Sequence, residues 1–270
     1  MKSQIRIILV SLLLISFFKA GAAVSRPAEM LFVNDADSLT EKSNSTTLSL
    51  LSWSQSGKLR EKPDIDYNRI LQFGKWIQFK KTKGCYDTRA QVLIRDSIIP
   101  ATSTDAKPCT IEEGEWLDSY SNQKFNHDSE IQIDHMVPLK EAYLAGAYQW
   151  TRAKRCVYAN FTGLKEHLIS TSNFENQSKS DKTPEAYIPP NKDYVCTYLK
   201  NWLTVKMIWK MSMTPGETNA IQKHFKDFNC NDSDFVVERA LVDDNRILAQ
   251  KLEALCPVPK VVKQKMAVVK

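Results

Sequence analysis

Several features that would place this 270-residue chain in a familiar class are missing. No two cysteines have the CxxC spacing, and none the CxxH spacing, of a thiolate zinc site, and no segment resembles a base-reading zinc finger. No internal repeat is present. After the first 23 residues, no stretch is apolar enough to cross a membrane. These absences leave a globular protein whose chemistry must come from local clusters of residues.

A strong excess of positive charge is also absent. The formal net charge is +6, but Lys2, Arg6 and Lys19 lie in the first 23 residues, so the rest of the chain carries only about +3. Global charge therefore does not indicate a nucleic-acid binder, and any such function has to rest on local groups.

The first 23 residues have the pattern of a secretory signal peptide. Lys2 and Arg6 precede an apolar run over residues 7–18, and the small residues "AGAA" favour cleavage after Ala22 or Ala23. An uncleaved membrane anchor is the alternative, although the apolar run is short for a bilayer. The pattern predicts a secreted or periplasmic protein with no membrane contact after cleavage.

An exported chain meets an oxidising environment, where cysteines pair as disulfides. The six cysteines are Cys85, Cys109, Cys156, Cys196, Cys230 and Cys256. Six cysteines allow 15 pairings. Our preferred set is Cys85–Cys109, Cys196–Cys230 and Cys156–Cys256.

Composition divides the remaining chain into three parts. Residues 24–64 are rich in Ser, Thr, Asn and Asp, which predicts a flexible linker with one short helix near residues 48–53. Residues 65–256 form the predicted globular domain. Residues 257–270 form a basic, weakly patterned tail.

Hydrophobic periodicity predicts an α+β domain. Strands are expected at 130–137 and 167–171, and a hairpin at 109–125 with its turn at Gly114. Helices are expected at 87–98, 139–150, 151–161 with Thr151 as N-cap, from 176, 193–211, 214–228 and 242–256. Thr214 and Glu217 have the spacing of a capping box. The stripe of Tyr194, Tyr198, Trp202, Val205 and Trp209 predicts core packing.

The segment "IQIDHMVPLKEA", residues 131–142, places an acid and an imidazole at the end of a strand. Neighbouring strand residues face opposite ways, so Asp134 and His135 share one centre only if the strand ends there, as Pro138 suggests. A carboxylate suits Mg²⁺, and a neutral imidazole suits proton abstraction. The pair predicts a metal ion beside a general base.

A second oxygen ligand and a phosphate-binding group are expected from "NQSKSDK", residues 176–182. Asn176 offers an amide oxygen, and Lys179 and Lys182 follow at spacings that share one side of a helix. Lysines at a helix start favour an anion.

The blocks "IDHMVPLKEAYLAGAYQWT" and "NQSKSDKTPEAYIPP" resemble the secreted HNH endonucleases of bacteria, which have "IDHVVPL" and "N.SKGD..P" blocks. "CYDTRAQVLIRD" and "YVCTYLKNWLTVKMIWKM" are similar too, so the resemblance covers residues 65–230. It implies a ββα-metal core, or His-Me finger, embedded in a mostly helical, disulfide-stabilised domain.

The resemblance also implies the roles of single residues. Asp134 and Asn176 would ligate one divalent metal, Mg²⁺ or alternatively Mn²⁺, and His135 would be the general base. His167 stands where the family usually has Asn, and would brace the loop of the base or turn toward the metal. The phosphate contacts would come from Arg89, Lys179 and Lys182.

Each residue also has a structural alternative. Asp134 can be a turn acid, and Asn176 a helix cap. His135 and His167 can be structural histidines. Arg89 can form a salt bridge, and both lysines can lie on a solvated face.

The resemblance implies a monomeric, secreted endonuclease that hydrolyses DNA or RNA with little sequence preference. One alternative is a catalytically inactive nucleic-acid-binding or cell-surface module that keeps the fold. Another is a hydrolase of a different phosphoester. No sequence feature identifies an inhibitor partner.

Overall fold

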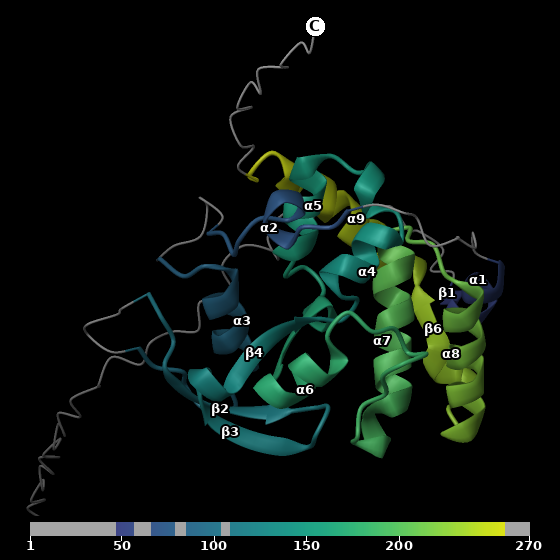
Figure 1. Ribbon diagram of the computed structural model, residues 1–270, viewed down its shortest axis with the longest axis horizontal. Coiled ribbons are helices and arrows are strands. Elements are labelled where there is room, and N and C mark those ends of the chain that lie inside the picture. Colours follow the sequence, from purple (N-terminus) through teal and green to yellow (C-terminus); the bar gives the residue numbers. More distant parts are fainter. Residues whose placement is uncertain (1–46, 57–65, 79–84, 104–108, 257–270) are drawn as a thin grey trace, which may run out of the picture.

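The computed structural model describes residues 47–56, 66–78, 85–103 and 109–256 (Figure 1). The predicted signal peptide, most of the linker and the basic tail lie outside these residues. None of the helices in the described part of the chain has the length and apolar composition that crossing a membrane requires.

Short helices and three small sheets make up the fold, which confirms the predicted α+β class. The helices are α1 (Leu50–Ser56), α2 (Arg69–Gln72), α3 (Thr88–Asp96), α4 (Leu139–Leu144), α5 (Arg152–Ala159), α6 (Asn173–Lys179), α7 (Val195–Ile208), α8 (Pro215–Asp227) and α9 (Arg239–Glu253). The strands are β1 (Thr47–Ser49), β2 (Glu113–Asp118), β3 (Gln123–His127), β4 (Ile131–His135), β5 (Leu168–Ser172) and β6 (Val236–Glu238).

Each described sheet is an antiparallel pair. β2 pairs with β3, β4 with β5, and β1 with β6. The β1–β6 pair joins segments from opposite ends of the described chain, at the side of the molecule where α7 and α8 stand (Figure 1).

The predicted hairpin exists, but its turn is in the wrong place. The turn lies between Asp118 and Gln123, where the Asp118 carboxylate accepts from the Tyr120 amide and the Ser121 hydroxyl. Gly114 lies inside β2. A side chain at Gly114 would clash with Ser97 and Trp116, so this glycine permits close packing and not a turn.

The linker prediction fails for residues 47–56. β1 and α1 occupy this segment, so the short helix expected near residues 48–53 is present but shifted to Leu50–Ser56. Leu50 is fully buried in the main core, and that burial holds the segment on the domain.

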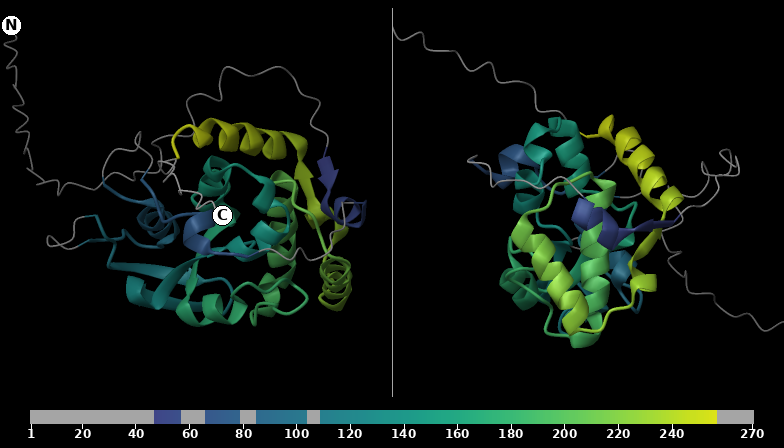
Figure 2. Two further views of the ribbon diagram at one scale, coloured as in Figure 1. Left: turned by 45° about the horizontal axis from the view of Figure 1, so that its top comes forward. Right: turned by 90° about the vertical axis from the view of Figure 1, so that its right-hand side faces the viewer.

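Two hydrophobic clusters fill the interior. The larger one gathers α4, α5, α7 and α9, and the aromatic side chains of Tyr198, Trp202 and Trp209 are buried in it as predicted. The smaller one lies between α3, β2, β4 and β5. α9 crosses over α5 and α7 along one side of the molecule (Figure 2).

All three preferred disulfides are confirmed, namely Cys85–Cys109, Cys156–Cys256 and Cys196–Cys230. The N-cap of α5 at Thr151 and the Thr214–Glu217 capping box of α8 are confirmed as well.

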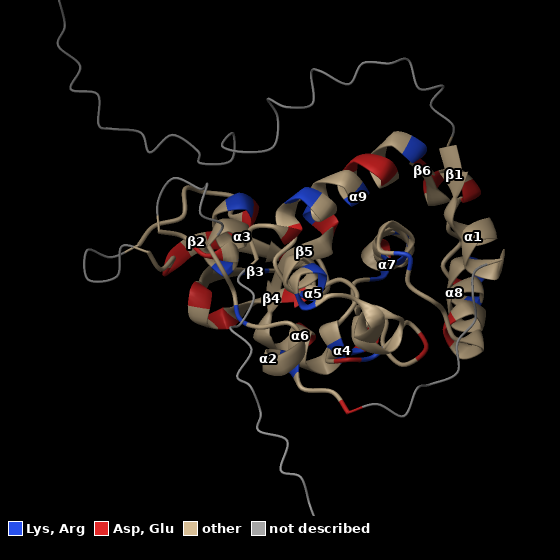
Figure 3. Cartoon of the chain, turned by 90° about the horizontal axis from the view of Figure 1, so that it is seen from above, with Lys and Arg blue, Asp and Glu red and all other residues tan. Residues whose placement is uncertain are grey.

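Charged residues of both signs share the same elements. α9, for example, carries Arg239, Asp243, Asp244 and Arg246 within two turns, and acidic and basic segments alternate along it in Figure 3. This helix therefore has no continuous basic stripe for a phosphate backbone.

Candidate functional site

β4, β5 and α6 form a strand–strand–helix unit that carries most of the predicted site. Asp134 pairs with Ile169 and His135 with Leu168 in the antiparallel register. α6 follows β5 directly, because the Ser172 hydroxyl accepts from the Glu175 amide and caps the helix. Since Ser172 is the cap, the alternative reading of Asn176 as the cap is wrong.

The two faces of β4 have different surroundings. Ile131 and Ile133 face the smaller hydrophobic cluster, and His135 follows them on the same side of the strand. Gln132 and Asp134 face α6, where they bond Asn176 and Lys179. Asp134 and His135 therefore lie on opposite faces of β4, as strand geometry requires.

Asp134 is buried, and both of its carboxylate oxygens accept hydrogen bonds. Its Oδ1 accepts from the Lys179 ammonium at 2.9 Å, and its Oδ2 accepts from the Tyr120 hydroxyl at 2.7 Å. Burial raises the pKa of this carboxyl, and the neighbouring Lys179 ammonium opposes the shift. We assign an ion pair, because the ammonium and the hydroxyl both donate to the carboxylate.

His135 is held from two sides. Its Nε2 lies 3.0 Å from the Ala159 carbonyl at the end of α5, and its ring stacks on Trp76 with centroids 5.4 Å apart. A carbonyl can only accept, so Nε2 carries the proton and Nδ1 has the free lone pair. Burial lowers the pKa of His135 well below its ordinary value of 6.5, with a smaller contribution from His167, so the ring is neutral at pH 7.

His167 acts on the same helix end. Its Nε2 lies 2.7 Å from the Tyr158 carbonyl, and its own carbonyl accepts from the Met136 amide. The two histidines thus bind successive carbonyls at the end of α5, where helix carbonyls lack the regular i+4 amide partner. His167 is completely buried, which lowers its pKa to about 4. This position agrees with the bracing role and keeps the ring away from solvent.

The remaining predicted residues lie around this centre. Asn176 is half-buried and donates from Nδ2 to Gln132 Oε1 at 2.7 Å. Arg89 donates to the carbonyls of Asp128 and Ile131, both at 3.1 Å, at the far end of β4. It therefore fixes the start of the strand, and it also forms the salt bridge of the structural alternative, to Asp128 at 3.5 Å.

The two predicted lysines have different surroundings. Lys182 is exposed and caps a carbonyl of α6 at Ser178. Lys179 is completely buried, so neither the direct phosphate contact that the resemblance implies nor the alternative of a solvated face agrees with its position. The side chain of Lys179 points into the interior, because Asp134, which accepts its hydrogen bond, lies on β4 beneath α6.

Tyr120 and Trp76 were missed by the sequence interpretation. Tyr120 follows β2 in the hairpin turn, and it reaches Asp134 only because the hairpin packs beside β5. Trp76 precedes α3 in a segment without periodicity. No pattern in the sequence marked either residue.

In this arrangement, the predicted metal ligands Asp134 and Asn176 do not fit a divalent ion. Both oxygens of Asp134 are used by Lys179 and Tyr120, and Asn176 directs its amide nitrogen to Gln132. Over the described ranges, no three His, Cys, Asp or Glu side chains group closely enough to hold a metal. A metal at Asp134 would first have to displace Lys179.

Two comparisons with known proteins bear on this site. The family described as "GmrSD restriction endonucleases, C-terminal domain" matches residues 87–224, about half of the chain, from the N-cap of α3 into α8. A protein of Arthroderma benhamiae named "Uncharacterized secreted protein" is 34% identical over 159 residues, which cover 59% of this chain and 74% of the relative. No solved structure matches.

Proposed function

The chain belongs to the family of GmrSD restriction endonuclease C-terminal domains, and from that premise we propose that it is a secreted endonuclease of the HNH type. At the coarse level the family is one of nucleases, so the expected substrate is nucleic acid. The matched residues 87–224 contain the whole β4–β5–α6 unit with His135. A secreted relative and three disulfides support an extracellular location.

The proposal depends chiefly on the protonation and orientation of the His135 ring. Its Nε2–H is held by the Ala159 carbonyl, so the neutral ring offers Nδ1 as the proton acceptor. Trp76 and the bond to Ala159 fix the ring plane, which a general base requires. His135 is 6% exposed, and the proposal requires that a water and a phosphate reach its ring edge.

The reaction we propose is hydrolysis of a phosphodiester. His135 Nδ1 takes one proton from a water molecule, whose oxygen attacks phosphorus. The bond from phosphorus to the 3′ oxygen breaks, and the leaving oxygen is protonated by solvent. The products carry a 5′ phosphate and a 3′ hydroxyl. The sequence contains no segment that resembles a base-reading helix or zinc finger, so little sequence preference is expected.

Mg²⁺, or alternatively Mn²⁺, stays our predicted cofactor, with Asp134 and Asn176 as the ligands to be tested. A bound divalent ion would neutralise negative charge on the phosphate. We assign it no step, because Lys179 and Tyr120 now occupy the oxygens of Asp134.

A cleavage assay with a matched histidine variant tests the proposal. Purified protein is incubated with supercoiled plasmid and with labelled DNA and RNA oligonucleotides, with Mg²⁺, with Mn²⁺ and with chelator. His135→Gln keeps an N–H donor for Ala159 but has no basic nitrogen, so cleavage should fall by about 10²–10⁴-fold. His127→Ala alters an exposed histidine and is the control.

Equal cleavage by His135→Gln and wild type, with the fold intact by circular dichroism, would remove His135 as the base. The chelator arm decides whether a divalent ion is needed.

A second candidate is a nucleic-acid-binding module without catalysis. The buried ion pair between Asp134 and Lys179 favours it, because it closes the predicted metal site. Wild-type protein that binds labelled DNA but never cleaves it, with any metal, would select this function.

A further inference from the structure

Lys179 lies where a metal ligated by Asp134 would be expected. Its ammonium donates to Asp134 Oδ1 and to the carbonyl of His135, both at 2.9 Å. A carboxylate and a backbone carbonyl are oxygen ligands that hard cations also prefer. The ammonium is completely buried, so it is part of the interior and not a surface charge that meets the site by chance.

The charge at this point is already balanced. Asp134 contributes one negative charge, Lys179 one positive charge, and the Tyr120 hydroxyl donates to the second carboxylate oxygen. A divalent ion on the same carboxylate would stand close to the buried ammonium, where like charges repel strongly. Occupation by the ammonium and by a metal are therefore mutually exclusive.

The backbone of Lys179 lies at the boundary between the interior and the surface. Lys179 is the last residue of α6, and Ser180, Asp181 and Lys182 after it are exposed. Its flexible four-carbon stem begins beside these exposed residues, and movement of the ammonium toward solvent is the conformational change that competition requires.

We propose that Lys179 competes with a divalent cation for Asp134, so that a metal enters this site only when the lysine leaves. The inference rests on the proposed function, because it concerns the metal of that same site. Competition lowers the apparent affinity for metal in proportion to the fraction of molecules in which Asp134 is free. The chain thus carries its own inhibitor of metal binding.

Mn²⁺ binding, measured by electron paramagnetic resonance, tests the competition without any need for cleavage. Lys179→Met keeps most of the stem and removes the charge. It should bind Mn²⁺ at least about tenfold more tightly than wild type, and adding Asp134→Asn should abolish that gain. Lys182→Met removes an exposed lysine three residues away and should bind as wild type does.

Unchanged or weaker Mn²⁺ binding by folded Lys179→Met, or a gain that survives Asp134→Asn, would overturn the competition. If Lys179→Met does not fold, the test uses the wild-type protein. The extent to which an amine-modifying reagent labels Lys179 is then measured by mass spectrometry as the Mn²⁺ concentration rises. Exposure of Lys179 as Mn²⁺ rises supports competition, and protection at every concentration overturns it.

The two proposals can fail separately. If Lys179→Met gains Asp134-dependent Mn²⁺ binding but no form cleaves nucleic acid, the nuclease function fails and the competition stands. If wild type cleaves through His135 and Lys179→Met gains no Mn²⁺ binding, only the competition fails.

Discussion

Ser180 holds a backbone conformation that suits glycine better than serine. Its φ of 50° and ψ of −125° lie where a Cβ atom is strained. The block "N.SKGD" of the resembled family has glycine at this position. Ser180→Gly should therefore raise the free energy of unfolding. The expected net gain is about 1 kcal/mol, once the extra conformational entropy of glycine in the unfolded chain is subtracted from the strain relieved.

Urea denaturation measures this change. Ser178→Gly, inside α6, is the matched control and should lower stability by about 1 kcal/mol. A destabilised Ser180→Gly variant would show that the serine is not strained.

Buried His167 makes stability depend on pH. Its pKa of about 4 in the folded protein lies below its ordinary value of 6.5, so the unfolded chain binds more protons between these values. This contribution to the free energy of unfolding is complete above pH 6.5. As the pH falls from 6.5 to 4, this contribution is lost, and the free energy of unfolding decreases by about 3 kcal/mol.

His167→Asn places the usual residue of the resembled family at this position and removes the titrating ring. The loss of unfolding free energy between pH 6.5 and 4 should become smaller by about 3 kcal/mol than in wild type. Denaturation curves at both pH values measure it. The same loss in both proteins would contradict the assignment.

The sequence predicted where the site residues lie along the strand and helix better than it predicted which way their side chains face. The end of a strand at Asp134 and His135 is readable from alternation and Pro138. The spacing of Asn176 and Lys179 correctly placed them on one side of α6, and both bond residues of β4. Whether that side faces solvent or β4 depends on tertiary packing, which a helical period does not contain.

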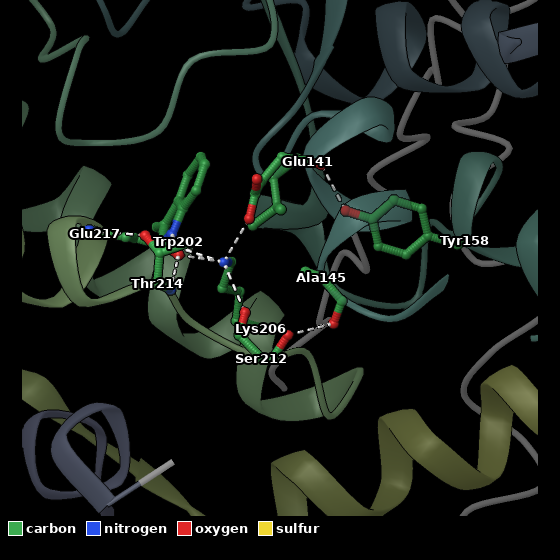
Figure 4. Close-up of polar contacts among 9 residues, drawn as sticks. Glu141, Ala145, Tyr158, Trp202, Lys206, Ser212, Thr214 and Glu217 are labelled. Carbon is green, nitrogen blue, oxygen red and sulfur yellow. Dashed lines mark hydrogen bonds and ion pairs between the residues drawn. The ribbon is translucent and has the colours of Figure 1, made fainter. Parts of the chain in front are cut away.

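At the scale of elements, a buried ion cluster joins three helices. The Lys206 ammonium of α7 bonds Glu141 of α4 at 2.8 Å and Glu217 of α8 at 2.7 Å, and Trp202 donates to Glu217 (Figure 4). These charged side chains are almost completely inaccessible to solvent. Loss of one partner would leave buried charge without compensation.

Lys206→Met should therefore lower the free energy of unfolding by about 3–5 kcal/mol, although methionine fills much of the same volume. Chemical denaturation measures it. Lys200→Met on the same helix, half-buried and outside the cluster, should change stability by less than about 0.5 kcal/mol. Similar losses in both variants would assign the effect to packing and not to charge.

Periodicity predicted the longer elements well, as α3, α5, α7, α8 and α9 show. It failed where packing overrides composition. Gly114 lies in a strand where Ser97 and Trp116 leave no room for a side chain. Residues 47–56 are ordered because β1 pairs with β6 and Leu50 is buried in the core. Such partners are distant in sequence, so a local pattern cannot reveal them.

At the scale of the whole molecule, the site lies where the two hydrophobic clusters meet. β4 belongs to the smaller cluster, whereas the Ala159 carbonyl that holds His135 ends α5 in the larger one. The geometry of His135 therefore depends on how α5 is anchored. α9 packs on α5, and the Cys156–Cys256 disulfide joins α5 to the segment after α9.

That disulfide closes the longest of the three loops, with 100 residues of separation against 24 for Cys85–Cys109. Restricting a longer loop removes more entropy from the unfolded chain. The Cys156→Ala/Cys256→Ala pair should cost about 4–5 kcal/mol, and Cys85→Ala/Cys109→Ala about 1 kcal/mol less. Denaturant titration of both double variants measures the order.

Because α5 positions the carbonyl that holds His135, loss of the Cys156–Cys256 disulfide should also lower cleavage at temperatures where most molecules remain folded. If cleavage per folded molecule equals that of wild type, the disulfide contributes to stability alone.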